Sequence, residues 1–273
     1  MTVRLALNDA TRRLAATSDT PRLDAELLMA HASGLSRERL LLGGCDGDVP
    51  ATFDAFIERR AAHEPVAYIT GHREFWTIHL AVGPDVLIPR ADSETLIEAA
   101  VEHFANRSPT RVLDLGTGSG ALLLAALAQW PSATGIGIDA SAAAIEIARH
   151  NARKLGIDER TQFTVGGWEH AGIGGPYDLV LCNPPYVGLS EALPADVILY
   201  EPASALFAGT DGLDDYRRIA PLLSLPDGGV ACIEIGASQA GAVSALFEAE
   251  GFLTHVKTDL GGHDRCLIVK PRI

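Results

Sequence analysis

The sequence predicts an α/β protein in which a small bundle of helices and a β-hairpin precede a doubly wound, seven-stranded sheet. Three observations predict this order. Only helical periodicity runs through the first 63 residues, and a two-residue alternation then replaces it as far as residue 88. Beyond residue 108, short apolar runs alternate with helical segments, as they do in a parallel sheet built from βαβ units.

Short helices are predicted for the N-terminal part of the chain. The first has apolar residues at helical spacing: Val3, Leu7, Ala10 and Leu14. Pro21 suits the first turn of a second helix, which Gly34 ends. Residues 36–42 and 52–63 continue the helical pattern. We therefore expect a helical bundle over residues 1–64.

A β-hairpin is predicted to follow the bundle. Pro65 breaks the helical pattern, and residues 68–88 then alternate as strands do. The apolar positions of this part are Phe75, Trp76, Ile78, Leu80 and Val82. From residue 92 a helical pattern returns, and it ends before Pro109. We expect residues 65–90 to form a hairpin linker between the bundle and the rest of the chain.

Seven strands are predicted in the remaining part, residues 91–273. The strands are expected at residues 111–115, 134–138, 162–165, 177–182, 229–235, 252–258 and 265–269. The helices between them are expected at residues 121–129, 141–155, 212–225 and 238–249. The connection between the last two strands is too short for a crossover helix, so these strands should pair antiparallel.

The composition argues against several classes of protein. The chain has 35 acidic and 22 basic side chains, a formal net charge of -13, which opposes a broad electrostatic grip on nucleic acid. The cysteines form no C-x-x-C pair, so we expect reduced thiols and no metal site at Cys45, Cys182, Cys232 and Cys266. Because the chain has neither an apolar signal region nor a stretch of about 18 apolar residues, we expect a cytoplasmic protein.

A glycine-rich segment follows the first strand of the sheet, after Asp114 and Leu115. It consists of Gly116, Thr117, Gly118, Ser119 and Gly120. Glycines here let the backbone approach a nucleotide-like ligand closely, and Asp139, at the end of the next strand, can bind ribose hydroxyls. Two plainer interpretations remain: the glycines permit a tight turn, and Asp139 caps the helix that starts at Ser141. The pattern does not separate NAD from S-adenosylmethionine.

The tetrapeptide Asn183-Pro184-Pro185-Tyr186 follows the fourth strand and indicates the chemistry. An amide nitrogen attacks a methyl donor poorly, because its lone pair is delocalised. The side-chain oxygen of Asn183 and the carbonyl of Pro184 can each accept one N–H, which holds the nitrogen and makes it richer in electrons. Pro184 and Pro185 stiffen the loop, while Tyr186 can cover the flat face of the acceptor. The plain alternative is a rigid turn after a strand.

These residues resemble the PrmC/HemK family of class I methyltransferases, and the likeness covers nearly the whole chain. Besides the glycine segment and the tetrapeptide, the matching segments are residues 71–76, 87–90, 201–202, 205–206 and 212–213, together with the helical N-terminal part. Several independent matches make chance an inadequate explanation. The resemblance implies transfer of a methyl group from S-adenosylmethionine to the side-chain amide of the GGQ glutamine of peptide chain release factors 1 and 2.

The resemblance also implies roles for residues and domains. Residues 1–64 would hold the release factor, and residues 91–273 would form the methyltransferase domain. Gly116 to Gly120 and Asp139 would bind the cofactor, and Trp168 would pack near the adenine, although a Trp after a strand also suits core filling. The tetrapeptide at Asn183 would bind the glutamine amide, with Asn183 also near the cofactor. We expect a monomer that binds neither membranes nor nucleic acid directly.

The chain departs from the family pattern at two positions. Ala91 replaces the usual proline after Arg90, and Gly167 replaces the usual acidic residue before Trp168, which leaves adenine recognition by a carboxylate in doubt. The pair Ser93-Glu94 keeps a polar and acidic character without an assigned role. A helix cap near the site entrance is its plain interpretation.

Three other functions compete with this interpretation. The first is a DNA or RNA methyltransferase acting on an exocyclic amine, adenine N6 or guanine N2, of a flipped base. The net charge disfavours it, and the only lysines are Lys154, Lys257 and Lys270. The second, a dehydrogenase with the same glycine loop, leaves the tetrapeptide without a task. The third is a non-enzymatic adaptor, against which the intact motifs argue.

Overall fold

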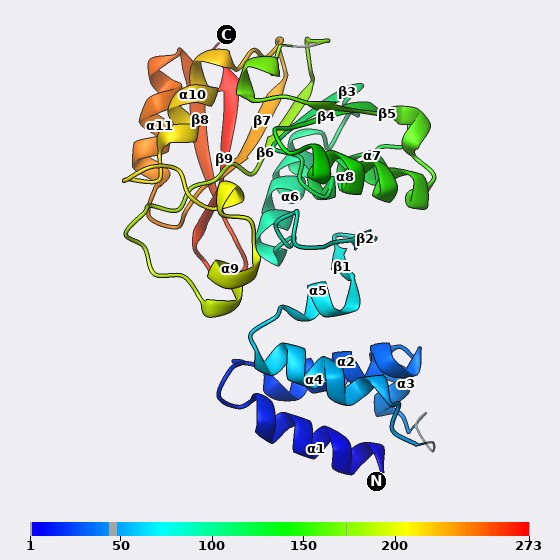
Figure 1. Cartoon of the computed structure of the whole chain (residues 1–273). Coiled ribbons are helices and arrows are strands. Elements are labelled where there is room, and N and C mark those ends of the chain that lie inside the picture. Colours follow the sequence, from blue (N-terminus) through cyan, green and yellow to red (C-terminus); the bar gives the residue numbers. More distant parts are fainter. Residues whose placement is uncertain (1, 44–47, 173, 273) are drawn as a thin grey trace. The chain divides into compact units, whose positions relative to one another are not determined.

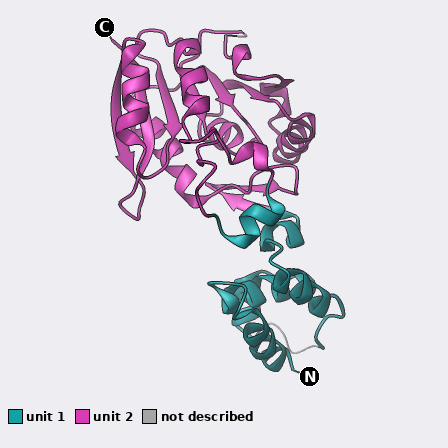
Figure 2. Cartoon of the chain, turned by 60° about the vertical axis from the view of Figure 1, so that its left-hand side comes forward, with its two compact units in different colours: residues 1–72, 193–201 teal, residues 73–192, 202–273 magenta. Residues whose placement is uncertain are grey.

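The computed structural model of the chain describes residues 2–43, 48–172 and 174–272, so Cys45 lies outside the described residues. The chain forms two compact units (Figures 1 and 2). Unit 1 contains Met1–His72 and Leu193–Glu201, drawn in teal in Figure 2, and unit 2 contains Arg73–Ala192 and Pro202–Ile273. The first unit therefore includes a segment from the second half of the sequence.

Unit 1 is helical, as the periodicity predicts. Its helices are α1 (Val3–Leu14), α2 (Pro21–Ser33), α3 (Arg37–Leu41), α4 (Thr52–Ala61), α5 (Val66–Thr70) and α9 (Ala195–Tyr200). Gly34 ends α2 in the left-handed conformation, which costs a glycine little. The apolar faces meet in one core, in which Leu14, Leu28, Met29 and Ile57 are fully buried. This core contains only residues of unit 1.

A buried ion pair ties two helices of unit 1 together. Arg60 of α4 donates from Nε to Asp24 Oδ2 of α2 at 2.7 Å, and both side chains are only 8% exposed. The hydroxyls of Ser18 and Thr20 also donate to the Asp24 carboxylate, at 2.7 and 3.1 Å. Asp24 therefore has the partners that a buried charge requires.

Helix α9 joins unit 1 through two polar contacts. The Arg60 guanidinium lies 3.7 Å from Asp196 of α9. The hydroxyl of Tyr200 donates to the carbonyl of Ala62 at 2.8 Å. These contacts explain why a segment far along the sequence belongs to the N-terminal helices. Sequence periodicity did not predict this helix.

The predicted hairpin is shorter than its sequence pattern. Strands β1 (His72–Phe75) and β2 (Ile78–Ala81) pair, but the prediction of extended chain over residues 68–70 is wrong, because these residues belong to α5. Ala67, Tyr68 and Ile69 are buried consecutively, which suits a helical turn and not an alternating strand. Gly71 then ends the turn with φ 78°. The hairpin also packs into the core of unit 2, through Phe75 and Leu80 among others.

Unit 2 contains the predicted seven-stranded sheet. Its strands are β3 (Arg111–Leu115), β4 (Thr134–Asp139), β5 (Thr161–Val165), β6 (Leu179–Cys182), β7 (Val230–Glu234), β8 (Phe252–Thr258) and β9 (Asp264–Pro271). Their order is β5-β4-β3-β6-β7-β9-β8. The first five in chain order are parallel, and β9 pairs antiparallel with both β7 and β8. The doubly wound sheet and its antiparallel end are confirmed.

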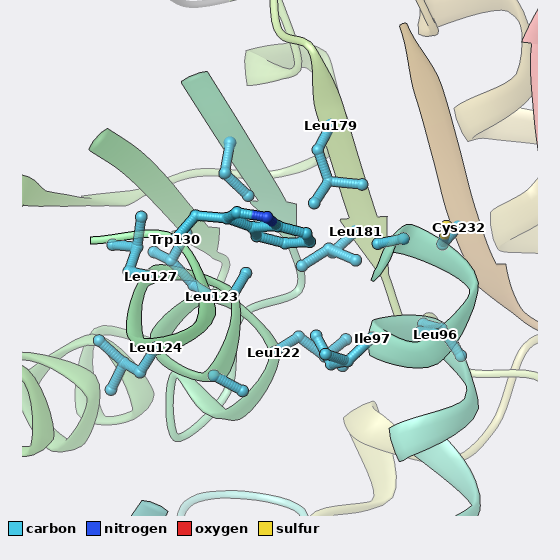
Figure 3. Close-up of a cluster of buried hydrophobic side chains, with 14 of the residues drawn as sticks. Leu96, Ile97, Leu122, Leu123, Leu124, Leu127, Trp130, Leu179, Leu181 and Cys232 are labelled. Carbon is cyan, nitrogen blue, oxygen red and sulfur yellow. The ribbon is translucent and has the colours of Figure 1, made fainter. Parts of the chain in front are cut away.

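Helices cover the two faces of the sheet and form two cores. On one face, α6 (Glu94–His103), α7 (Ala121–Gln129) and α8 (Ala142–Leu155) pack against residues such as Leu179, Leu181 and Cys232. Figure 3 shows residues of this cluster from α7 and α6, including Leu123, Leu96 and Ile97, together with Leu179, Leu181 and Cys232 of the strands. On the other face, α10 (Asp214–Ile219) and α11 (Ala240–Ala249) pack against the alternate strand residues. Neighbouring residues of one strand thus serve different cores.

Helix α10 is shorter than the predicted helix over residues 212–225. Pro221 ends regular helical pairing, and the chain continues as a 3-10 turn over Ala220–Leu222. The described cysteines, Cys182, Cys232 and Cys266, are free and buried, which agrees with the prediction of reduced thiols. Across the described ranges, no helix is long and apolar enough to cross a membrane.

The strand order determines where a ligand can bind. The chain proceeds from β3 toward β4 on one side and later returns to β6 on the other, so the order reverses between β3 and β6. In such sheets the loops at the carboxyl ends of the two strands diverge and leave a crevice. The glycine segment follows β3 and the tetrapeptide follows β6, so both motifs lie at this point.

Candidate active site

A cavity of about 730 Å³ lies at this reversal point of the sheet in unit 2. It is lined by eight of the residues proposed from the sequence: Gly116, Thr117, Gly118, Ser119, Asp139, Trp168, Asn183 and Pro185. Gly120, Pro184 and Tyr186 are not part of its wall. Its size suits a ligand of several hundred daltons.

The glycine loop passes close under the cavity. Gly116 adopts φ 72°, and its N–H, like that of Thr117, donates to the carbonyl of Ile138 at 2.9 Å. A Cβ on Gly116 would lie 3.2 Å from the Trp168 ring and 3.7 Å from the backbone oxygen of Asn183. Only a residue without a side chain fits here. Gly116 therefore brings Trp168 and Asn183, predicted from distant parts of the sequence, to one place.

Gly120 has a different task from Gly116. A Cβ at this position would lie 2.9 Å from Leu124, inside the packing of α7. Gly120 also adopts φ 84° as the residue before that helix. It permits the turn from the loop into α7, which is the plainer interpretation considered for the glycines.

The carboxylate of Asp139 is held by backbone N–H groups. Oδ2 accepts from Gly118 at 2.8 Å, and Oδ1 accepts from Ser141 at 2.8 Å. The cap of α8 is Ser141, whose hydroxyl accepts from the Ala144 N–H at 3.2 Å, so the interpretation of Asp139 as the helix cap is wrong. The bond to Gly118 fixes the Asp139 carboxylate against the glycine loop. Each oxygen keeps a further lone pair, and Asp139 lines the cavity. This geometry leaves it able to accept hydroxyls.

Asp114 is a buried acid beneath the loop, and the sequence analysis gave it no role. It is fully buried, and Oδ2 accepts from the Thr117 hydroxyl at 2.6 Å. Oδ1 is buried without a hydrogen-bond partner among the described residues. Burial, with a smaller contribution from Asp139, raises the pKa of Asp114 to about 7. The sequence feature that could have indicated Asp114 is its position near the end of β3, two residues before Gly116.

Trp168 forms part of the cavity wall and is fixed at its nitrogen. Its Nε1 donates to Asp215 Oδ1 of α10 at 2.8 Å, and its ring lies against the position of Gly116. Trp168 is partly buried and also packs against the core on that face. Its packing near an adenine stays a prediction.

Glu169 supplies an acidic side chain next to Gly167, the position at which the family usually has an acidic residue. Glu169 lines the cavity, and its Oε1 accepts the Gly167 N–H at 3.2 Å. A Cβ on Gly167 would lie 2.6 Å from Glu169 Oε2, so the carboxylate folds back over the glycine. An acidic group is therefore present at this edge of the cavity, although it comes from another position. The sequence analysis did not predict Glu169, because the family pattern concerns only the residue before Trp168.

The tetrapeptide leaves β6 with both of its polar side chains anchored. Asn183 Nδ2 donates to the Ser93 hydroxyl at 3.3 Å. The Tyr186 hydroxyl donates to Glu234 Oε1 at 3.2 Å, and the Tyr186 carbonyl accepts from Gln239 at 2.9 Å. Burial and the nearby Glu234 charge raise the pKa of Tyr186, so it stays a neutral donor. The covering of an acceptor by Tyr186 stays a prediction.

Glu234 is the last residue of β7 and is only 1% exposed. Burial raises the pKa of Glu234. Three groups act to lower it: a hydrogen bond from Ser93, the charge of Arg265 and the hydrogen bond from Tyr186. Ser93 precedes α6, yet its side chain makes no cap to that helix, so the plain interpretation as a cap is wrong. Glu94, its neighbour, instead accepts the backbone N–H of Trp76 in the hairpin at 2.8 Å.

Known proteins match this chain over nearly its whole length. Models of the PrmC N-terminal domain and of a methyltransferase domain match residues 6–71 and 106–211. A release factor glutamine methyltransferase of Rhodospirillum rubrum is 43% identical over 98% of this chain and 85% of its own. One of Moorella thermoacetica is 41% identical over 100% of this chain and 99% of its own. The chain belongs to the release factor glutamine methyltransferases.

Solved structures agree with this family at the level of the fold. A methyltransferase from Pyrococcus furiosus has a TM-score of 0.53 at 16% identity, covering 71% of this chain and 89% of its own. The catalytic domain of hMettl16 has a TM-score of 0.59 at 13% identity, covering 79% and 83%. The class I methyltransferase fold expected from the resemblance is thus confirmed. Within the described residues of this release factor glutamine methyltransferase, no cluster of potential ligands could hold a metal ion.

Proposed function

We propose that this chain transfers a methyl group from S-adenosylmethionine to the side-chain amide nitrogen of the GGQ glutamine in release factors 1 and 2. The supporting observation is the meeting of the glycine loop and the tetrapeptide at one cavity, where a Cβ on Gly116 would lie 3.7 Å from the Asn183 backbone. Membership of the family supports the choice of substrate, since its relatives are named for that activity.

The cavity residues fit the cofactor. The loop at Gly116 is a cradle that a Cβ would fill, and Asp139 offers anchored lone pairs for the ribose hydroxyls. Glu169 offers an acceptor near Trp168, which suits an amine or a hydroxyl of an adenosine. When bound, S-adenosylmethionine supplies a methyl group activated by a sulfonium.

The tetrapeptide positions and activates the acceptor nitrogen. Because Asn183 Nδ2 is bonded to Ser93, its Oδ1 is left to accept one N–H of the glutamine amide, and the Pro184 carbonyl accepts the other. Drawing on both hydrogens concentrates electron density on the nitrogen, and the rigid loop aligns it. The methyl group that the cofactor would supply would bond to this nitrogen as its bond to sulfur breaks, and the N-methylated, N-protonated amide is so acidic that it would release its proton to water. The residues therefore supply alignment and polarisation, and no tuned base is needed.

One experiment tests the acceptor. The protein is incubated with methyl-labelled S-adenosylmethionine and, separately, with a release factor, a release factor whose GGQ glutamine is replaced, total RNA and duplex DNA. We expect label on the unaltered release factor only. Label on RNA or DNA alone would show the exocyclic-amine activity instead. Label on the altered release factor would show another target residue.

The variant Asn183→Ala tests the role of the amide. Loss of one positioned hydrogen-bond acceptor should lower kcat by about 100-fold or more. The dissociation constant for the cofactor, measured by calorimetry, should change little. A variant that loses cofactor binding but keeps its rate at saturating cofactor would contradict the acceptor role.

A further inference from the structure

Three side chains form a hydrogen-bonded path from the core of unit 2 to the tetrapeptide. Glu234 lies at the end of β7, Ser93 lies in the turn before α6, and Asn183 follows β6. Ser93 donates to the Glu234 carboxylate and accepts from Asn183 Nδ2 at 3.3 Å. Glu234 and Ser93 are only 1% and 3% exposed, so water competes little for these bonds. Ser93 and Asn183 both line the cavity, and the Asn183 side-chain oxygen is left to accept a hydrogen bond there.

We propose that Glu234 and Ser93 are positioning residues that set which end of the Asn183 amide faces the methyl acceptor. This inference rests on the proposed function of Asn183 and adds two residues to it. The amide oxygen and nitrogen of an asparagine are similar in size, so shape alone does not choose between the two orientations. A hydrogen-bond partner of defined polarity makes the choice.

The Glu234 carboxylate sets the direction of the hydrogen bonds along this path. An ionised carboxylate only accepts hydrogen bonds, so the Ser93 proton points to Glu234. The Ser93 oxygen then presents lone pairs to Asn183, and only the NH₂ end of the amide can donate to them. Oδ1 is thereby directed away from Ser93. The flipped amide would place its oxygen against the lone pairs of Ser93 and would lose this hydrogen bond, which is unfavourable.

Glu234 has the surroundings of an acceptor. Its Oε1 also accepts the Tyr186 hydroxyl, and its Oε2 is buried without a partner among the described residues. The charges that act on it are Arg265, which favours ionisation, and Asp92, which opposes it. Arg265 is held by Asp259 at 3.2 Å and lies 3.5 Å from Asp92. One carboxylate thus orients both polar side chains of the tetrapeptide.

The test compares Ser93→Ala, Ser93→Thr and Glu234→Gln in the full-length protein. We expect Ser93→Ala and Glu234→Gln to lower kcat about twofold or more, because the amide is then free to populate both orientations. The KM for the release factor and the dissociation constant for the cofactor should stay near wild type. Ser93→Thr should retain most of kcat, since it keeps a hydroxyl that donates and accepts.

A matched control separates positioning from packing. Thr95 is a buried hydroxyl residue two positions along, 5% exposed, and Thr95→Val removes its hydroxyl at nearly constant shape. This variant should keep the wild-type kcat, and thermal unfolding should show that all variants are folded. A wild-type kcat in Ser93→Ala, or a folded Ser93→Thr as slow as Ser93→Ala, would overturn the inference. A wild-type protein that labels no release factor would instead overturn the proposed function.

Discussion

Single residues of the glycine loop decide whether the cavity can take a ligand. Gly116 combines a left-handed φ of 72° with a position 3.2 Å from the Trp168 ring for an added Cβ, so even a methyl group would be strained and crowded. The loop is also tied to β4, because Gly116 and Thr117 share the carbonyl of Ile138.

We therefore expect Gly116→Ala to weaken cofactor binding by about tenfold or more, the effect of ~1.4 kcal/mol of strain. Titration calorimetry with S-adenosylhomocysteine measures this change. Gly241→Ala is the matched control, since a Cβ at Gly241 meets nothing within 4 Å and its φ is not left-handed. Equal affinity in both variants would show that the ligand does not lie against Gly116.

Asp114 should make stability depend on pH. Its folded-state pKa of about 7 lies above the usual 3.8, so the folded protein favours the neutral acid. The stability that this protonation contributes is complete below the usual pKa and is lost as the pH rises through about 7. Asp114→Asn, which cannot ionise, should gain stability relative to wild type by about 2 kcal/mol between about pH 5.5 and pH 8.

Urea unfolding of both proteins at the two pH values tests the prediction. Asp215→Asn is a useful control, because Asp215 is another buried acid of the same unit, and its carboxylate accepts from Trp168 and lies 3.4 Å from Arg218. A difference between wild type and Asp114→Asn that does not vary with pH would mean that Asp114 is ionised at both values.

At the scale of elements, the regular strands and helices could be predicted because their periodicity is local. The buried run of β3, the leucines of α7 and the short link between β8 and β9 each carry their own signal. Helices α5 and α9 could not be predicted, since each has only five or six residues and α9 has no buried residue. The tertiary contacts of Arg60 and Tyr200 place α9, and these are absent from local sequence.

The candidate site was predictable to the extent that motifs follow strands. Gly116, Asp139 and Asn183 were found because each follows or ends an apolar run. Glu234 was not, because it is embedded in the apolar run of β7, where a strand pattern gives no reason to expect an acid. Its link to Ser93 depends on neighbouring strands and a turn that are distant in sequence.

The buried pair of Arg60 and Asp24 leads to a prediction at this scale. Arg60→Met should destabilise the helical unit by about 3 kcal/mol, because it leaves a buried carboxylate without its cation. Arg12→Met is the matched control, since Arg12 forms only an exposed ion pair with Asp9 and should cost little. Circular dichroism during urea unfolding measures both. Equal stabilities would show that the hydroxyls of Ser18 and Thr20 suffice for Asp24.

At the scale of the molecule, the hydrophobic cores do not cross between the units. The core around Leu28 contains residues of unit 1 only, and the two cores on the faces of the sheet contain residues of unit 2 only. Separate cores allow separate unfolding, so a single two-state transition is not expected.

We expect two transitions in scanning calorimetry. Arg60→Met should lower the midpoint of one transition. Leu123→Ala, which truncates a fully buried side chain of unit 2, should lower the midpoint of the other transition, because it should cost about 2–5 kcal/mol of stability. Binding of S-adenosylhomocysteine should raise the midpoint of only that transition whose midpoint Leu123→Ala lowers. One transition that responds to all three changes would show that the units unfold together.

The chain passes between the units three times: at His72–Arg73, at Ala192–Leu193 and at Glu201–Pro202. The second passage begins six residues after Tyr186, so the tetrapeptide leads into the segment that forms α9 in the helical unit. The third passage returns the chain to unit 2. A chimera that exchanges only the first 72 residues with a relative would therefore set this chain's own α9 against the relative's residues at positions 60 and 62. Replacing the helical unit as a whole requires grafting two separate stretches of gene together, one for residues 1–72 and one for residues 193–201.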